Sequence, residues 1–508
     1  MNDCGTVTVI NQRSTFQRET DKKGNEMSRK CAARYFAALV VSCLFIILQP
    51  SILVCQTKMD TSIAGMWQGT LEFNNNKIRV VFRVAITDTG KLAASLDSPD
   101  QGAKGIPASV VFVTKDSVRI LVESIGGLYA GKRSADDSSI TGKWTQGGGS
   151  LPLTMVRTTA EIKYVRPQEP KPPFPYKSEE ISFGSELTGM KYSGTLTYPD
   201  SGGPFPAAIL ITGSGAHDRD EYIFGHKPFL VIADCLTKRG IAVLRVDDRG
   251  VGGSTGDKMA VSTVEHAQDV IAEMQYLKSR SEIDSSEIGL IGHSEGGIIA
   301  PMVAAKSKSV AFVVLLAGTG MRGEKIIVDQ TRLMLKSEGV PDSQIVKITS
   351  EQENEFRIMG ISSDSVMVVD SLKSYLRANI TQWAGNGANK DPEKAIDGKI
   401  KWLLSPWYHY FLFHDPQNDL ERVKCPLLAM DGTLDLQVPG KENLDEIEKA
   451  LKKGGSGDFT IKLLPGLNHL FQNAKTGDES EYAQIEETFS TEALSIMGNW
   501  IVEKTGNK

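Results

Sequence analysis

The stretch Gly292-His293-Ser294-Glu295-Gly296 decides the fold, because it lies between an apolar run, Ile288 to Ile291, and a helical run that starts near Gly297. A strand, a tight turn and a helix therefore follow one another directly. A side chain in place of either flanking glycine would collide with the neighbouring strand or helix. The pattern predicts an exposed serine hydroxyl near the positive end of a helix, where a negatively charged oxygen is stabilised.

A serine alone is a weak nucleophile, so this interpretation requires an acid and then a histidine farther along the chain. Both follow strands late in the sequence. The run Leu427 to Met430 leads into a loop with two carboxylates, Asp431 and Asp435, and a second apolar run ends at Leu464, shortly before His469. We predict His469 as the base, with Asp431 and Asp435 as the candidate acids.

Two further histidines compete with His469. His293 lies inside the serine turn, and His217 lies near the end of an earlier strand. Both positions suit packing or substrate contact better than the role of a base held by Asp435.

The negatively charged intermediate of such a reaction needs two backbone N–H donors. The first comes from the residue after the nucleophile, Glu295. The second is expected in the glycine-rich turn Thr212 to Gly215, where the N–H of Ser214 is the candidate. The carboxylate of Glu295 would bring negative charge near this oxyanion hole unless it points away or is paired.

Around the serine turn, apolar strands alternate with helical stretches, which predicts a parallel sheet covered by helices over residues 179–508. The expected strands include Ala207 to Thr212, Ile241 to Val246, Val310 to Leu316 and Phe459 to Leu464, and the last helix runs from about Glu487 to Val502. The alternation breaks at about residues 320–420, where helical and aromatic-rich sequence predicts an inserted cap.

Residues 60–158 follow a different pattern, with short alternating runs such as Lys77 to Val84 separated by Gly, Asp, Asn and Ser. This predicts an antiparallel all-β domain. Similar phrases around Trp67 and Trp144 open and close the domain, so we expect its first and last strands to pair in a small barrel or sandwich. Both tryptophans are expected in the core. A proline-rich linker, residues 159–178, follows.

Residues 1–56 are expected to form an N-terminal extension and a signal peptide. Basic residues precede the apolar run Tyr35 to Leu48, which at about 14 residues is shorter than the ~20 that a membrane-spanning helix needs. The pattern predicts export to the periplasm or the exterior. An uncleaved anchor and a lipid attached at Cys55 are the alternatives, and no other membrane contact is expected.

Composition and motif content argue against several classes of protein and of binding site. The chain of 508 residues is 40% apolar and 23% charged with a net charge of −5, and it has no basic run that would indicate nucleic-acid binding. Only two cysteines, Cys235 and Cys425, lie beyond residue 55, so no disulfide framework is expected. The sequence contains no zinc-ligand or nucleotide-binding motif, and we expect neither a metal nor a cofactor.

The motifs from Ile181 to Val502 together resemble the α/β-hydrolase superfamily, and more closely its serine-aminopeptidase and dienelactone-hydrolase-like branch. The resemblance implies an α/β-hydrolase fold with a helical cap and a Ser-His-Asp triad. It selects Asp435 over Asp431, because the spacing of Gly432, Asp435 and Val438-Pro439 matches the acid loop of the family.

Two charged segments are assigned no catalytic role. The turn Asp247 to Ser254 resembles the DxRGxGxS turn of α/β hydrolases, which is chiefly structural. For the cluster Asp218 to Glu221, solvated surface charge is the favoured interpretation, and a role in shaping the entrance to the site is the alternative.

The sequence around Gly213 to Gly215, Gly225 to Phe229 and Asn468 to Phe471 also resembles secreted bacterial esterases that carry an N-terminal β domain. That resemblance implies hydrolysis of esters with short acyl chains. Two alternatives stay open. One is a peptidase of the same fold, acting on short peptides, in which acidic cap residues such as Glu351, Glu353 and Glu355 bind a substrate terminus. The other is a noncatalytic envelope-binding protein.

Overall fold

A computed structural model describes residues 60–73, 76–101, 103–146, 149–160, 165–362, 365–380 and 392–506. The extension and signal peptide expected for residues 1–56 lie outside this range. Within the described residues, no helix combines the length and the apolar character needed to cross a membrane.

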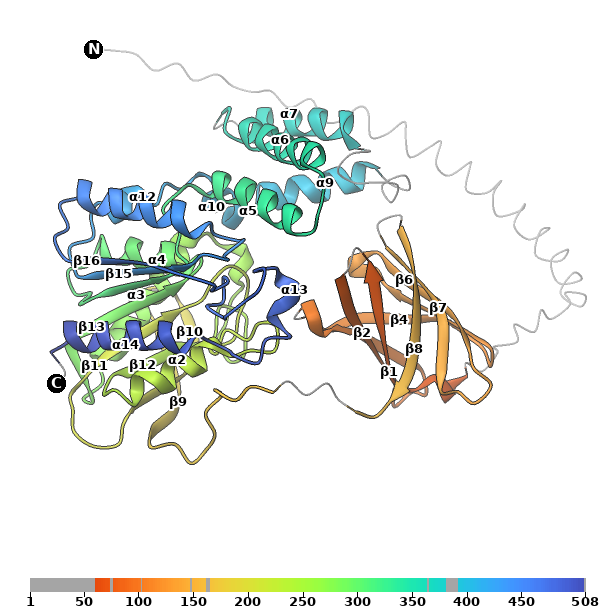
Figure 1. Ribbon diagram of the computed structural model, residues 1–508, viewed down its shortest axis with the longest axis horizontal. Helices are drawn as coiled ribbons and strands as arrows, with labels where there is room; N and C mark the ends of the chain where they lie inside the picture. Colours follow the sequence, from red (N-terminus) through yellow and green to blue (C-terminus); the bar gives the residue numbers. More distant parts are fainter. Residues whose placement is uncertain are drawn as a thin grey trace, which may run out of the picture. The chain divides into compact units, whose positions relative to one another are not determined.

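The N-terminal β domain is a closed, eight-stranded antiparallel barrel (Figure 1). Its strands are β1 (Gly65–Phe73), β2 (Asn76–Ile86), β3 (Leu92–Ser98), β4 (Ala103–Val113), β5 (Ser117–Val122), β6 (Gly127–Arg133), β7 (Ser139–Gln146) and β8 (Gly149–Thr158). The first and last strands pair, with Trp67 opposite Arg157. Of the two expected forms, barrel and sandwich, the chain adopts the barrel.

Alternation along the strands builds the interior of the barrel. In β2, Val80, Phe82 and Val84 are buried, and in β5 every second residue is buried. Successive side chains of a strand point to opposite faces, so these residues meet inside the barrel. Trp67 and Trp144 are also buried there, as expected.

The C-terminal domain is built on an eight-stranded sheet in the order β16-β15-β14-β13-β11-β12-β10-β9. Its strands are β9 (Tyr176–Ser185), β10 (Met190–Pro199), β11 (Phe205–Ile211), β12 (Ala242–Val246), β13 (Ile283–His293), β14 (Val313–Leu316), β15 (Leu427–Gly432) and β16 (Phe459–Leu464). The six strands from β11 to β16 pair in parallel, as expected.

The first two strands of this sheet depart from the expectation of a parallel sheet. β9 and β10 form an antiparallel hairpin, and β10 pairs antiparallel with β12. A turn of four residues, 186–189, joins them, which is too short for a parallel crossover.

Helices cover both faces of the sheet, with α2 (Pro228–Thr237) and α14 (Thr491–Lys504) on one face and α3 (Thr263–Lys278), α4 (Gly296–Ala304) and α12 (Gly440–Lys453) on the other (Figure 1). In β11, Ala207, Ile209 and Ile211 belong to one apolar core and Ala208 and Leu210 to the other. Both sides of β11 are therefore apolar, because neither face of this strand meets water.

A helical cap is inserted between β14 and β15. It contains α5 (Gly323–Ser337), α6 (Asp342–Met359), α7 (Ser365–Ala378), α9 (Pro392–Leu403), α10 (Pro406–Phe413) and α11 (Gln417–Leu420). Trp407 and Phe411 of α10 are buried in the same core as α3 and α4. The cap is thus packed into the body of the domain.

Candidate active site

The candidate residues follow strands that end at one edge of the sheet. β13 ends at His293, β15 at Gly432 and β16 at Leu464, and these strands run in parallel with β14 among them. Parallel strands end at the same edge, so Ser294, Asp435 and His469 all follow strands that reach this edge.

Ser294 lies in a strained turn. Its φ angle is +52°, in the left-handed region that non-glycine residues rarely adopt. Its neighbours must be small: a Cβ atom on Gly292 would lie 2.0 Å from the carbonyl oxygen of Gly296, and one on Gly296 would lie 2.3 Å from that of Ile211. The backbone N–H of Ser294 donates to the carbonyl of Leu316 at 2.9 Å. The side chain is partly exposed at the start of α4.

His469 and Asp435 are joined by a hydrogen bond of 2.6 Å between Nδ1 and Oδ2. Both side chains are buried. The second carboxylate oxygen of Asp435 accepts the backbone N–H groups of Gln437 at 2.7 Å and Val438 at 2.8 Å. These bonds fix the position of the Asp435 carboxylate. Because Nδ1 of His469 contacts Asp435, Nε2 is the ring nitrogen that remains for the role of base.

The competing carboxylate, Asp431, is fully buried at the end of β15. One of its oxygens accepts the N–H of Gly432 at 2.7 Å. Burial, reinforced by the neighbouring charge of Asp435, raises the pKa of Asp431 well above its usual value. Asp431 therefore favours its protonated form more than an ordinary aspartate does, beside the carboxylate that holds His469.

His293 connects the serine turn to the histidine loop. It is buried, its Nδ1 lies 3.0 Å from Glu221 Oε1, and its Nε2 lies 3.0 Å from the carbonyl oxygen of His469. Burial lowers the pKa of His293, but the ion pair with Glu221 outweighs it, and the net pKa is raised. His293 is thus held by Glu221, whereas Asp435 holds His469.

Of the segment Asp218 to Glu221, only Glu221 is buried and the other three residues are half-buried, so the expectation of a solvated cluster was wrong for Glu221. Glu221 is only 2% exposed and accepts the N–H of Gly213 at 2.8 Å in addition to its bond with His293. Asp220 pairs with the buried Arg245 on β12. Glu221 and Asp220 thus have partners on a neighbouring strand or turn, which offset the cost of removing these charges from water.

The candidate oxyanion loop lies directly against the nucleophile, since a Cβ atom on Gly213 would be 3.1 Å from Ser294 Cβ. The next residue, Ser214, donates its hydroxyl to Glu295 Oε2 at 2.9 Å. The two predicted oxyanion-hole residues are thus bonded to each other through their side chains.

The carboxylate of Glu295 is buried and paired with neutral donors. Besides Ser214, it accepts the hydroxyl of Thr263 at 2.9 Å and the indole N–H of Trp407 at 2.9 and 3.0 Å. Trp407 comes from the cap and Thr263 from the start of α3. The carboxylate that the sequence places beside the nucleophile is therefore held by three side chains.

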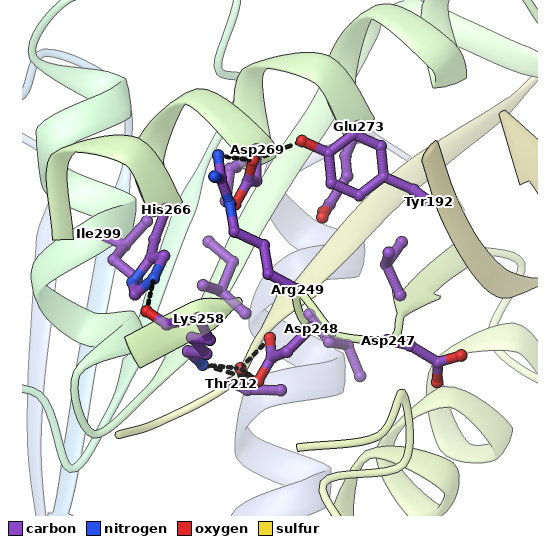
Figure 2. A pocket seen from close by; sticks show the side chains of 14 residues that line it. Tyr192, Thr212, Asp247, Asp248, Arg249, Lys258, His266, Asp269, Glu273 and Ile299 are labelled. Carbon is purple, nitrogen blue, oxygen red and sulfur yellow. Dashed lines mark hydrogen bonds and ion pairs between the residues drawn. The ribbon is translucent and has the colours of Figure 1, made fainter. Parts of the chain in front are cut away.

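Behind this loop lies a buried polar cluster (Figure 2). The ammonium group of Lys258 bonds to Asp248 at 2.7 Å, and to Thr212 Oγ1 and the carbonyl of Gly213 at 3.0 Å each. Asp248 also accepts the backbone N–H of His217 at 2.8 Å. The cavity at this cluster, about 40 Å³, has room for one or two water molecules. This cluster buttresses the loop, consistent with a structural role for the Asp247 to Ser254 turn.

Sequence reasoning missed Lys258, Glu221 and Trp407 as parts of this arrangement. Lys258 lies in a short 3₁₀ helix (Lys258–Ala260) without a motif, and Trp407 belongs to the aromatic-rich sequence that predicts the cap. No signal in the linear sequence connects Glu221 or Trp407 to the serine turn, because Glu221 is 72 residues from His293 and Trp407 is 112 residues from Glu295.

Parts of the chain are similar to known proteins. Residues 227–376 match the family model described as serine aminopeptidase, S33, and this segment contains Ser294 and part of the cap. The C-terminal domain has the α/β-hydrolase fold. The chain is 26% identical over 297 residues to the esterase EstD of Thermotoga maritima, covering 58% of this chain and 61% of EstD. The match thus spans less than two thirds of the relative.

Two further proteins are similar to the α/β hydrolase. An uncharacterised 31.7 kDa protein of Escherichia coli is 23% identical over 44% of this chain and 73% of its own length. A solved esterase of Pyrococcus furiosus is 16% identical, with a TM-score of 0.39, covering 68% of this chain and 99% of the esterase.

Proposed function

We propose that this α/β hydrolase cleaves carboxylic esters with short acyl chains, with Ser294 as nucleophile, His469 as base and Asp435 as the acid that orients it. The observation that carries the proposal is the 2.6 Å hydrogen bond of His469 with Asp435, at the sheet edge where Ser294 occupies a strained turn. Similarity to an esterase, EstD, supports the same reaction class.

The proposed reaction begins when Oγ of Ser294 attacks the acyl carbonyl carbon and Nε2 of His469 takes the hydroxyl proton. The backbone N–H groups of Ser214 and Glu295 donate to the resulting oxyanion. The imidazolium then protonates the departing alkoxide, which leaves an acyl group on Ser294. Water, deprotonated by His469, hydrolyses that ester and restores the free serine.

The surroundings of His469 suit this role. Asp435, with two backbone N–H groups on its other oxygen, keeps the proton on Nδ1 and stabilises the imidazolium. The bond from His293 to the carbonyl of His469 fixes the histidine loop from the other side. Hydrogen bonds from Trp407 and Thr263 hold the carboxylate of Glu295 in place.

The test is turnover of p-nitrophenyl esters from acetate to palmitate by the purified protein and by Ser294→Ala. We expect the wild type to hydrolyse short esters. The Ser294→Ala variant should lose activity by several orders of magnitude, to a residual rate about 10³–10⁴ times that of the uncatalysed reaction in water. Equal turnover by Ser294→Ala would refute the mechanism. Absence of turnover by the wild type on all esters and amides would favour a noncatalytic envelope-binding protein.

A peptidase is the second candidate, favoured by the description of the matching family model as serine aminopeptidase. Such an enzyme needs charge for a substrate terminus. Of the three acidic cap residues considered for this role, Glu355 is buried and bonded to Lys399 at 2.5 Å, which leaves Glu351 and Glu353. Turnover of aminoacyl p-nitroanilides without ester turnover would decide for the peptidase.

We further propose that the protein is exported, from the basic and apolar sequence of residues 29–48. N-terminal sequencing of the protein recovered from periplasmic and culture fractions tests this. Recovery of the full chain from the cytoplasm alone would refute it.

A further inference from the structure

One end of the N-terminal barrel is sealed. The indole N–H of Trp67, near the start of β1, donates to the carbonyl of Ile63 at 2.8 Å, and Ile63 is fully buried. Arg133, at the end of β6, bonds Asp60 at 2.6 Å, and the guanidinium carbon of Arg157 lies 4.2 Å from the centroid of the Trp67 ring. The middle of the barrel is filled by side chains that include Phe82, Tyr129 and Met155.

The opposite half of the barrel is hollow. It contains a cavity of about 700 Å³ at the end where β1, β3 and β7 finish and β2, β4 and β8 begin. Its apolar lining includes Leu71, Val80, Leu96, Ile106, Trp144 and Leu151. An eight-stranded barrel is either filled by its own side chains or holds one small ligand. This barrel combines a filled half with an open half.

The chemistry of the lining indicates what the cavity accepts. None of the described residues that line it is ionisable, and its polar side chains, Ser98, Gln146 and Ser150, are all neutral. Two of these, Gln146 and Ser150, are exposed. Burying a charge there would go uncompensated, whereas an aliphatic chain gains from leaving water. The volume lies in the range of small-molecule sites, roughly 300–1,000 Å³.

We propose that the barrel is a binding site for one neutral single-chain aliphatic compound, an alcohol or ester, with its chain in the cavity and its oxygen among Gln146 and Ser150. The site is distinct from Ser294 and does not depend on the proposed hydrolysis. Each methylene that enters the cavity should tighten binding about fourfold, until the chain reaches the filled half.

The experiment uses the full chain and the neutral fluorophore N-phenyl-1-naphthylamine, displaced by 1-hexanol, 1-octanol, 1-decanol and 1-dodecanol. Ile106→Trp fills the cavity from β4, and Ala103→Phe fills it independently from the same strand. The matched control is Val111→Trp, also on β4, where the native side chain is 50% exposed. Circular dichroism and the melting temperature report whether each variant is folded.

We expect the wild type and Val111→Trp to bind the probe, with displacement that strengthens along the alcohol series, and each filling variant to lose at least tenfold in affinity. Absence of binding by the wild type would overturn the proposal. Unchanged binding by folded Ile106→Trp and Ala103→Phe would do so as well, because it would place the probe elsewhere, for example in the hydrolase domain. Affinity that does not change with chain length would also overturn it.

Discussion

Replacing each of the two neighbouring carboxyls by its amide separates their roles. In Asp435→Asn the amide no longer stabilises the imidazolium and favours the wrong tautomer of His469, whose Nδ1 lies 2.6 Å from Asp435 in the wild type. A change of this kind costs about 10⁴ in kcat, or roughly 5.5 kcal/mol of transition-state stabilisation. In Asp431→Asn an amide replaces a carboxyl whose pKa is raised by burial and whose protonated form is therefore favoured, so we expect kcat/KM to stay within about threefold.

The same pair has a stability signature whose sign follows from the raised pKa of Asp431. The folded state holds the proton of Asp431 more tightly than the unfolded state. The stability of the wild type is therefore highest below the unfolded pKa, about 4, and falls as pH rises toward the folded value. Asp431→Asn lacks this loss. Its stability relative to the wild type should rise by about 1.4 kcal/mol per pH unit in that window.

The assays are kcat/KM on p-nitrophenyl acetate at pH 7.5 and urea unfolding at pH 4.5, 6.0 and 7.5, for both variants. A loss of about 10³-fold or more in kcat/KM for Asp431→Asn, with unchanged urea unfolding, would refute the conclusion that Asp431 takes no part in catalysis. Full activity of Asp435→Asn would refute the triad itself.

Three further perturbations test the surroundings. Trp407→Phe removes a donor to Glu295 and should lower kcat about tenfold, with Trp402→Phe, which is exposed, unaffected. Glu221→Gln should destabilise by roughly 1–3 kcal/mol at pH 6 in urea unfolding and by less at pH 9, because the raised pKa of His293 contributes stability only while the imidazole is protonated. Gly296→Ala should lower the melting temperature, whereas Gly398→Ala, with open space around its Cβ position, should not.

Strong local patterns predicted much of the fold. The period-two alternation of residues 77–84 and the apolar strands beside Ser294 carry their information within a few residues, and each element formed close to its expected place. The sequence did not predict β9 and β10, because their mixed polar and apolar pattern adjoins a proline-rich segment. That segment is also tied down: Arg166 and Gln168 donate to the carbonyls of Ala483 and Phe489.

The buried charges could not be predicted in the same way. The sequence predicts that Asp218 to Glu221 lie at the surface, because four consecutive charged residues rarely all find partners in the interior. Here the partners come from β12, from the turn after it and from His293, and they are adjacent only once the sheet has formed. Pairing between residues distant in sequence decides whether a charge is buried, and a single sequence does not contain that information.

The bond between Trp407 and Glu295 links the cap to the proposed chemistry. Glu295 supplies a predicted oxyanion N–H, and its side chain is fixed by the cap through Trp407, by α3 through Thr263 and by the oxyanion loop through Ser214. A movement of α10 would remove one of these donors while leaving a buried carboxylate, which is costly unless the carboxylate also moves. The position of the cap and the geometry of the oxyanion hole are therefore coupled, and cap variants should alter kcat as well as substrate choice.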